Sequence, residues 1–273
     1  MVRSLWTAAT GMIAQQNNVD TIANNLANVN TTGFKTEENE FKSLLYQTIQ
    51  TKTTTANGAQ KPVGAQVGLG VRNNAITSQF SQGAFLASES NFAFAIGGDG
   101  FFGIRGEDGN TYYTRNGNFN VSLGVDGLTL TDMNGNPVLN TDGEPIVIGS
   151  PDDYIASNVT VDAAGNLMYP DDDNNLQPMG MQIGLWQFQN PAGLNKQGDT
   201  LYAVTAASGP AINENENDNL TPSTVRQGYL EGSNVQVADE MVNLIVAQRA
   251  YELNSKAITT TDEMMQLANQ LKR

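Results

Sequence analysis

Residues 4–30 read SLWTAATGMIAQQNNVDTIANNLANVN, and this stretch decides the fold of the chain. Apolar residues recur in it every seven positions, with a second row three positions on, which predicts a helix with an apolar seam along one face. We place the N-cap of this helix at Ser4 and its end at Gly33, where a left-handed residue closes a helix. The seam is formed by Leu5, Ala8, Met12, Val19, Ile22, Leu26 and Val29.

The rest of this helix carries almost no charge. Between Ser4 and Asn30 the only charged side chain is Asp20, whereas an ordinary surface helix carries Lys and Glu on its outer face. Gly11 and the many Asn residues are poor helix formers, so the helix must take its stability from packing partners. Its uncharged face of Asn, Gln and Thr can be buried against neighbouring subunits if each side chain finds a hydrogen-bond partner.

The other end of the chain repeats the pattern. We expect a helix from Asn234 to Leu271, about 55 Å long at roughly 1.5 Å per residue. Its N-cap is Ser233 or Asn234, and Ser233 followed by Gln236 fits a capping box. The two terminal helices either pair within one globular monomer or pack against other copies. The second seam contains Met241, Leu244, Tyr251, Ile258 and Met265.

The composition excludes several classes of function. The net charge is −14, which disfavours nucleic acid and anionic membranes as partners. The chain has no His and no Cys, so Ser-His-Asp and Cys-His catalysis and ordinary zinc sites are impossible within it. No run is long and apolar enough to span a membrane, and the start of the chain lacks a cleavable secretory signal. Catalysis by a pair of carboxylates stays open, because their separation depends on the fold.

The middle of the chain alternates short β-rich runs with turn dipeptides. The runs lie at 94–96, 101–104, 112–114, 119–121, 128–130, 146–148, 159–161, 167–169, 181–188 and 201–204. Asp-Gly and Asn-Gly pairs between them suit type I′ hairpin turns, which predicts an antiparallel β-domain over residues 93–219. The glycines of these pairs are Gly100, Gly109, Gly117, Gly127, Gly135 and Gly143.

Two further segments join the helices to this β-domain. Residues 34–49 suit a second short helix or an extended arm, and residues 51–70 are rich in Thr, Gln and Gly without periodicity, as in a long extended connection. The fold class is therefore α+β with coiled-coil-like helical ends. We expect a terminal helical domain at 1–33 and 234–273, a connecting layer at 34–92 and 220–233, and the β-domain between them.

Three stretches suggest binding chemistry, and each has a simpler interpretation. Asp132 opens a run like a calcium loop, but Pro137 and Gly143 stand where that loop needs Gly and Glu. The acids Asp171–Asp173 are typical of a solvated loop, and Gly97–Gly100 lacks the Lys and helix start of a phosphate loop. We therefore assign no catalytic, metal or cofactor site.

Motifs at both ends of the chain resemble the flagellar basal-body rod and hook family. One motif spans residues 24–35, another runs from Glu231 to Met264, and shorter ones lie at 95–102 and 113–119. The runs at 248–255 and 45–49 are most similar to the distal-rod branch of that family. The first motif contains Asn25, Leu26, Ala27, Asn28, Gly33, Phe34 and Lys35.

The resemblance implies a structural subunit without enzymatic activity that polymerises with itself. It implies that the terminal helices form an inner tube around the export channel and that the two apolar seams make the assembly interface. The implied partners are further copies, other rod and hook-junction proteins, the surrounding ring proteins and the flagellar export apparatus. The implied location is the basal body, reached without a cleaved signal peptide. The alternatives are a hook or proximal-rod paralogue and, more distantly, a secreted β-domain enzyme or binding module for cell-wall glycan.

Overall fold

The computed structural model describes residues 2–50, 64–124, 127–150, 154–171, 175–217 and 220–271. The chain divides into two compact units. The helical unit consists of Met1–Ala27, Glu37–Thr77 and Gln236–Arg273, and the β unit consists of Asn28–Thr36 and Ser78–Val235. The prediction of an α+β chain, with a helix at each end and an antiparallel β-rich middle, is confirmed. The three-part division into tube, connecting layer and β-domain stays a prediction.

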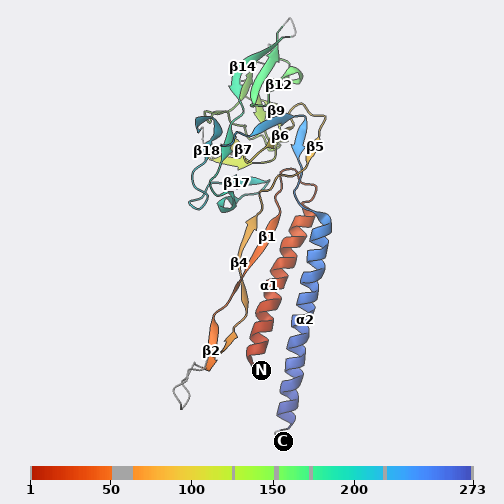
Figure 1. Cartoon of the computed structure of the whole chain (residues 1–273). Coiled ribbons are helices and arrows are strands. Elements are labelled where there is room, and N and C mark those ends of the chain that lie inside the picture. Colours follow the sequence, from red (N-terminus) through yellow and green to blue (C-terminus); the bar gives the residue numbers. More distant parts are fainter. Residues whose placement is uncertain are drawn as a thin grey trace. The chain divides into compact units, whose positions relative to one another are not determined.

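Two antiparallel helices form the main part of the helical unit. Val2–Ala27 (α1) and Val237–Gln270 (α2) lie side by side (Figure 1). Near the end of α1, Asn25 Nδ2 donates a hydrogen bond of 3.3 Å to Glu240 Oε2 near the start of α2. Further along, a Cβ atom on Gly11 would lie 2.9 Å from the amide nitrogen of Asn254, so the glycine permits close helix approach.

Small and polar residues dominate the buried positions of these helices. On α2 the buried residues are Glu240, Ala247 and Thr261, which lie seven or fourteen positions apart and so share one face. Of the predicted N-terminal seam, only Ala8 and Ile22 belong to the buried set, and much of the apolar surface of the helices stays exposed. The buried residues of α1 are Ala8, Ala14, Thr21, Ile22 and Asn25.

Both predicted helix boundaries at the inner ends are wrong. α1 ends at Ala27 rather than at Gly33, because the chain turns at once, with Thr31 N donating to Asn28 O at 3.1 Å. Gly33 does have a left-handed φ of 71°, but six residues beyond the helix. α2 begins at Val237 behind Gln236, whose side chain makes no capping hydrogen bond. The proposed cap Asn234 is engaged elsewhere, as described below.

A strand arm completes the helical unit. Glu37–Ser43 (β1) pairs with Val71–Ser78 (β4), and Tyr46–Gln50 (β2) pairs with Ala65–Gly68 (β3). Of the two alternatives for residues 34–49, the extended arm is therefore confirmed. Of the predicted connection at 51–70, residues 51–63 lie outside the described part of the chain, and residues 65–68 form the strand β3.

The β unit is built from antiparallel strand pairs. Its largest sheet has the order β16-β17-β8-β7-β15-β18, with Asn195–Lys196, Leu201–Ala203, Thr111–Thr114, Phe101–Arg105, Leu185–Gln187 and Ile212–Asn213. Two three-stranded sheets have the orders β11-β10-β9 (Val147–Gly149, Leu128–Thr131, Asn120–Leu123) and β12-β13-β14 (Thr160–Val161, Asn166–Pro170, Leu176–Gln182). Two pairs are β19-β6 (Thr224–Gln227, Phe94–Gly97) and β20-β5 (Tyr229–Glu231, Phe85–Ala87). Short 3-10 helices lie at Ala156–Asn158, Pro191–Gly193 and Glu214–Glu216.

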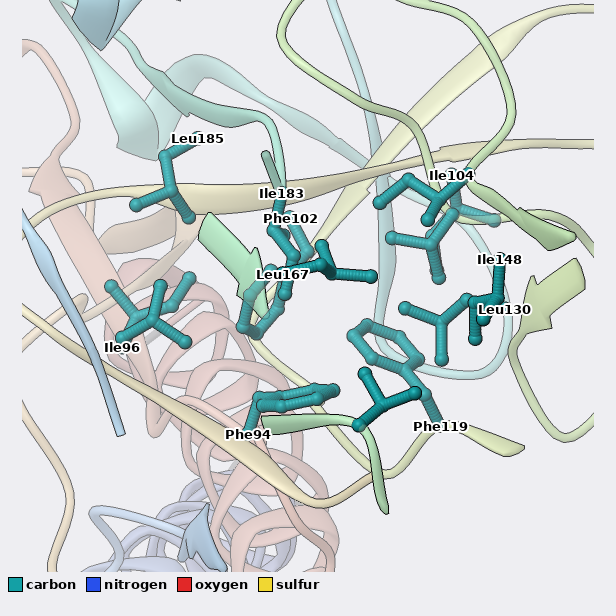
Figure 2. Packing of buried hydrophobic residues seen from close by; sticks show 14 residues of the cluster. Phe94, Ile96, Phe102, Ile104, Phe119, Leu130, Ile148, Leu167, Ile183 and Leu185 are labelled. Atoms are coloured by element: carbon teal, nitrogen blue, oxygen red, sulfur yellow. The ribbon is translucent and has the colours of Figure 1, made fainter. Parts of the chain in front are cut away.

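Apolar side chains from these sheets meet in one main core (Figure 2). Phe102 and Phe119 pack edge to face with ring centroids 5.1 Å apart, an arrangement favoured by the ring quadrupoles. Around them lie Phe94, Ile104, Leu130, Ile148 and other fully buried residues. A second, aromatic cluster is formed by Phe101, Tyr113, Leu139, Trp186, Leu194 and Tyr202.

Most of the predicted glycine turns take the left-handed conformation. Gly109, Gly127, Gly135 and Gly143 all have positive φ, but the prediction of type I′ turns is wrong, because Asp108, Asn134 and Asp142 lack the positive φ that type I′ requires at both central residues. Gly109, Gly135 and Gly143 are instead the fourth residues of their turns, each donating its N–H to the carbonyl oxygen three residues earlier. Gly100 and Gly117 do not have a positive φ. At Gly117 the glycine serves packing instead, because a Cβ there would lie within 1.8 Å of the carbonyl oxygen of Phe94.

Candidate assembly site

Exposed apolar side chains are concentrated on the helical unit. Among the described residues, 26 large apolar side chains are exposed, and 19 of these belong to the helical unit. Seven lie on the arm, from Phe41 to Ile76, and Trp6 and Ile13 lie on α1. Surfaces of this kind on a soluble protein mark interaction sites. On α2 the exposed residues are Val237, Met241, Val242, Ile245, Val246, Tyr251, Leu253, Met264 and Leu267.

The predicted interface residues have different degrees of burial. Met241 is 52% exposed and Tyr251 is 42% exposed, whereas Ile22 is only 5% exposed. Val29 is half-buried and belongs to the β unit rather than to the helical unit. The assignment of these residues to an assembly interface stays a prediction. The other residues of the set, all half-buried, are Leu5, Met12, Val19, Leu26, Leu244, Ile258 and Met265.

A groove runs between the two helices. It has a volume of about 380 Å³ and is lined by Gln16, Val19, Gln248, Tyr251 and Glu252. Its one carboxylate, on Glu252, accepts a hydrogen bond of 2.9 Å from Arg249 at the surface. Across the described ranges, no group of three or more Asp or Glu residues is arranged to hold a metal ion. The groove therefore offers a contact surface and no evident chemistry.

The motif at residues 24–35 fixes backbone turns through its side chains. Asn25 binds the backbone of Glu37 at both ends of its amide, accepting from N at 2.8 Å and donating to O at 2.8 Å. Asn28 Oδ1 accepts from Thr31 Oγ1 at 3.1 Å in the turn that follows α1. Gly33 N donates to the carbonyl oxygen of Glu231 at 2.8 Å. Leu26 and Phe34 are half-buried, and Ala27 is exposed.

Lys35, the last residue of the motif, lies in a buried ionic cluster of the β unit. Its Nζ donates to Glu231 Oε1 at 2.6 Å and to Ser81 O at 2.7 Å. Arg115 Nη1 donates to Glu231 Oε2 at 3.4 Å, and the guanidinium carbon lies 4.9 Å from the centre of the Phe101 ring. Gly83 N supplies a further hydrogen bond of 2.9 Å to Glu231 Oε1. We call Lys35, Arg115 and Glu231 the ionic cluster.

Burial dominates the electrostatics of the ionic cluster. The side chains of Lys35, Glu231 and Arg115 are 0%, 0% and 1% exposed. Desolvation lowers the pKa of Lys35, and the attraction of Glu231 raises it part of the way back. The same two causes, in the same order, lower the pKa of Arg115. Glu231 thus compensates two cations that burial would otherwise make very costly.

A hydrogen-bonded joint beside the ionic cluster closes the β unit. Asn234 Oδ1 accepts from Thr36 N at 2.7 Å and from Thr36 Oγ1 at 2.8 Å. Its Nδ2 donates to Gln79 O and to Ser81 Oγ, both at 2.8 Å. Segments 198 residues apart in sequence are therefore joined by one side chain. Asn234 is used in this way rather than as a helix cap.

The stretches with possible binding chemistry have structural roles in the described chain. Asp132 Oδ1 accepts from the backbone nitrogens of Asn134 and Asn136, each at 2.8 Å, so the carboxylate is used within its own turn. The run Gly97–Gly100 joins β6 to β7, with Gly98 at a φ of 134°. Of the predicted acidic run, Asp172 and Asp173 lie outside the described residues. In the described part of the chain, no helix is long and apolar enough to cross a membrane.

Three family models match the chain. The model for flagella basal body rod proteins matches residues 5–35, and the model for the C-terminal region of flagellar basal body rod FlgEFG proteins matches residues 226–271. The model for the D1 domain of flagellar hook proteins FlgE/F/G matches residues 95–169. Together these matches define a protein of the flagellar rod and hook class.

Full-length relatives identify the branch. The chain is 44% identical to the flagellar basal-body rod protein FlgG of Borreliella burgdorferi, with 100% of both chains covered. It is 40% identical to FlgG of Agrobacterium fabrum, with 98% of both covered, and 38% identical to FlgG of Bacillus subtilis, with 100% of both covered. The chain therefore belongs to the flagellar basal-body rod family, in the distal-rod group of FlgG. A hook or proximal-rod paralogue is not favoured.

Proposed function

We propose that this chain is a structural subunit of the flagellar distal rod that polymerises through its helical unit. The observation that carries the proposal is the exposed apolar surface of α2 and of the strand arm. Burying an apolar side chain of this size stabilises an assembly by roughly 1.5–3 kcal/mol. Nine such residues on α2 alone supply a sufficient driving force for association.

The construction of the helix pair supports the same proposal. Inside the chain, the buried faces of the helices hold small and polar residues such as Ala247, Thr261 and Asn25, which bury little apolar area. The apolar residues of the seams are instead exposed or half-buried, with the exceptions of Ala8 and Ile22. They are available to helices of neighbouring copies, which would surround the export channel as an inner tube.

Family membership supports the remaining parts of the proposal. The chain has no enzymatic role, and its partners are the neighbouring rod and hook-junction proteins, the rings that surround the shaft and the flagellar export apparatus. It leaves the cell through that apparatus without a cleaved signal peptide and is located in the basal body. The names of its relatives support the location and the structural role.

The test compares a double charge substitution on α2 with a single one on the β unit, all three at apolar residues of similar exposure. Val246→Lys with Leu253→Lys places two charges on α2, where the side chains are 62% and 68% exposed. Leu123→Lys places a charge on the β unit at a residue that is 71% exposed. By electron microscopy, the wild type and Leu123→Lys should form straight tubes, and the α2 variant should stay monomeric. Tubes from the α2 variant at wild-type yield would refute assembly through this face.

A further inference from the structure

Net charge is divided very unevenly between the two units. The residue ranges of the helical unit contain nine basic and nine acidic residues, so this unit is neutral. The β unit contains five basic and nineteen acidic residues, so it carries the whole net charge of −14. If the charged residues were evenly distributed, each unit would carry part of the net negative charge. The unit with most of the exposed apolar side chains among the described residues is thus the one without net charge.

The cations of the β unit do little to offset this charge at its surface. Lys35 and Arg115 are buried against Glu231 in the ionic cluster. Outside that cluster, three basic residues remain against eighteen acidic ones. Two of these cations are held locally, since Arg105 donates to Gly143 O at 2.7 Å and Arg226 lies 4.9 Å from the centre of the Phe85 ring. Of the described acidic side chains of the β unit outside the cluster, ten are exposed, so a large acidic excess faces solvent.

Apolar contacts do not counteract this repulsion on the β unit. Its apolar residues are gathered in its two cores, and only seven of its described large apolar side chains are exposed. Like charges on neighbouring compact units repel each other, and mobile ions screen that repulsion over a Debye length of about 10 Å at 0.1 M salt. The helical unit therefore favours association of copies, and the β unit opposes it.

We infer that the β unit is an electrostatic brake on self-association, which mobile cations release. The inference rests on the proposed function, because it concerns polymerisation through the helical unit. At low ionic strength, repulsion among β units keeps the chain monomeric despite its exposed apolar helices. As cations screen the β units, apolar contacts between helical units prevail and the polymer forms. The brake thus makes assembly depend on the ionic conditions that the chain meets.

The experiment changes the charge of the β unit in both directions without touching the helical unit. The first variant changes four exposed residues to Gln: Glu89, Glu107, Glu144 and Glu216. Its net charge is about −10 instead of −14. Because repulsion scales with the product of the charges, it falls to about half. The matched control changes the exposed residues Gln177, Gln189 and Gln197 to Glu, which raises repulsion to about one and a half times its original value.

Assembly of the full-length proteins is followed by light scattering and electron microscopy at NaCl concentrations from low to high ionic strength. The salt concentration at half-assembly should be about twofold lower in the Gln variant than in the wild type, and clearly higher in the Glu variant. Salting-out of apolar groups acts equally on all three proteins and cannot produce this order. Equal midpoints in all three would overturn the brake while leaving polymerisation intact. Absence of tubes from every protein at every salt concentration would overturn both.

Discussion

The ionic cluster gives the sharpest prediction, through the substitution Glu231→Gln. This change preserves the shape of the side chain and removes its charge. Two buried cations, Lys35 and Arg115, are then left with no compensating carboxylate within the cluster. Removing one partner of a buried ion pair typically costs about 3–5 kcal/mol, because the other charge stays desolvated. We expect a loss of this size in the free energy of unfolding of the β unit.

The loss is read from urea unfolding monitored by tryptophan fluorescence. Trp186 lies in the aromatic core of the β unit, while Trp6 lies on α1 and is 68% exposed. A Trp6→Phe background therefore isolates the signal of the β unit. With a denaturant dependence of about 2 kcal/mol per M, the unfolding midpoint should fall by about 1.5–2.5 M. Glu216→Gln, an exposed change in the same unit, should leave the midpoint nearly unchanged.

A second substitution distinguishes lost charge compensation from general damage. Lys35→Met in the Glu231→Gln background removes one of the two uncompensated cations and should recover part of the lost stability. A midpoint within about 0.5 M of the wild type for Glu231→Gln alone would refute our account of the cluster. It would mean that the two cations are not as desolvated as the burial of their side chains indicates.

Three other predictions test single residues. Asn39 is 8% exposed, and neither polar atom of its side-chain amide has a hydrogen-bond partner. Asn39→Leu should therefore stabilise the helical unit by about 1–2 kcal/mol, measured by urea unfolding. A loss of stability would contradict this prediction. Gly33→Ala should cost about 2 kcal/mol or more, because φ is 71° and the new Cβ would lie 2.6 Å from Asn116 N. Gly109→Ala, with φ of 79° and no atom within 4 Å, should cost less, and thermal unfolding of the two variants measures the difference; equal losses would contradict this. Burial raises the pKa of Tyr113 above 10.0, so the folded state keeps its proton longer than the unfolded state and stability falls as pH rises through 10. Urea unfolding between pH 8 and 11 should show a smaller loss of stability with pH for Tyr113→Phe than for the wild type. An unchanged dependence of stability on pH would contradict the raised pKa of Tyr113. Lys35, whose pKa is lowered, contributes to the pH dependence with the opposite sign in both proteins.

Local sequence was sufficient wherever structure depends on near neighbours. The period of seven predicted both terminal helices, because helical residues three, four and seven positions apart lie on the same face. The β-rich runs and Asp-Gly pairs predicted most strands of the β unit, and four of the six turn glycines have the left-handed φ that was expected. The motif at residues 24–35 indicated the family, because it is a run of consecutive residues that can be recognised without knowledge of their distant partners.

The helix ends and the pairing of the helices depended on more distant residues. Asn234 and Ser233 are both good capping residues, so sequence could not exclude them as caps. Asn234 instead binds Thr36, Gln79 and Ser81, which are far away in the chain. Similarly, the apolar period gave no indication that small and polar residues would be the buried ones on α2.

By itself, the sequence determined the fold class, the family and the absence of His and Cys chemistry, since all three follow from composition and short patterns. Only the tertiary structure revealed the ionic cluster, because Lys35 and Glu231 are 196 residues apart and a lone Lys or Glu gives no sign of its partner. The division of charge between a neutral helical unit and a β unit of −14 was likewise hidden. The chain leaves the helical unit and returns to it, so its charge can be assigned to units only once folding has brought the separate segments together.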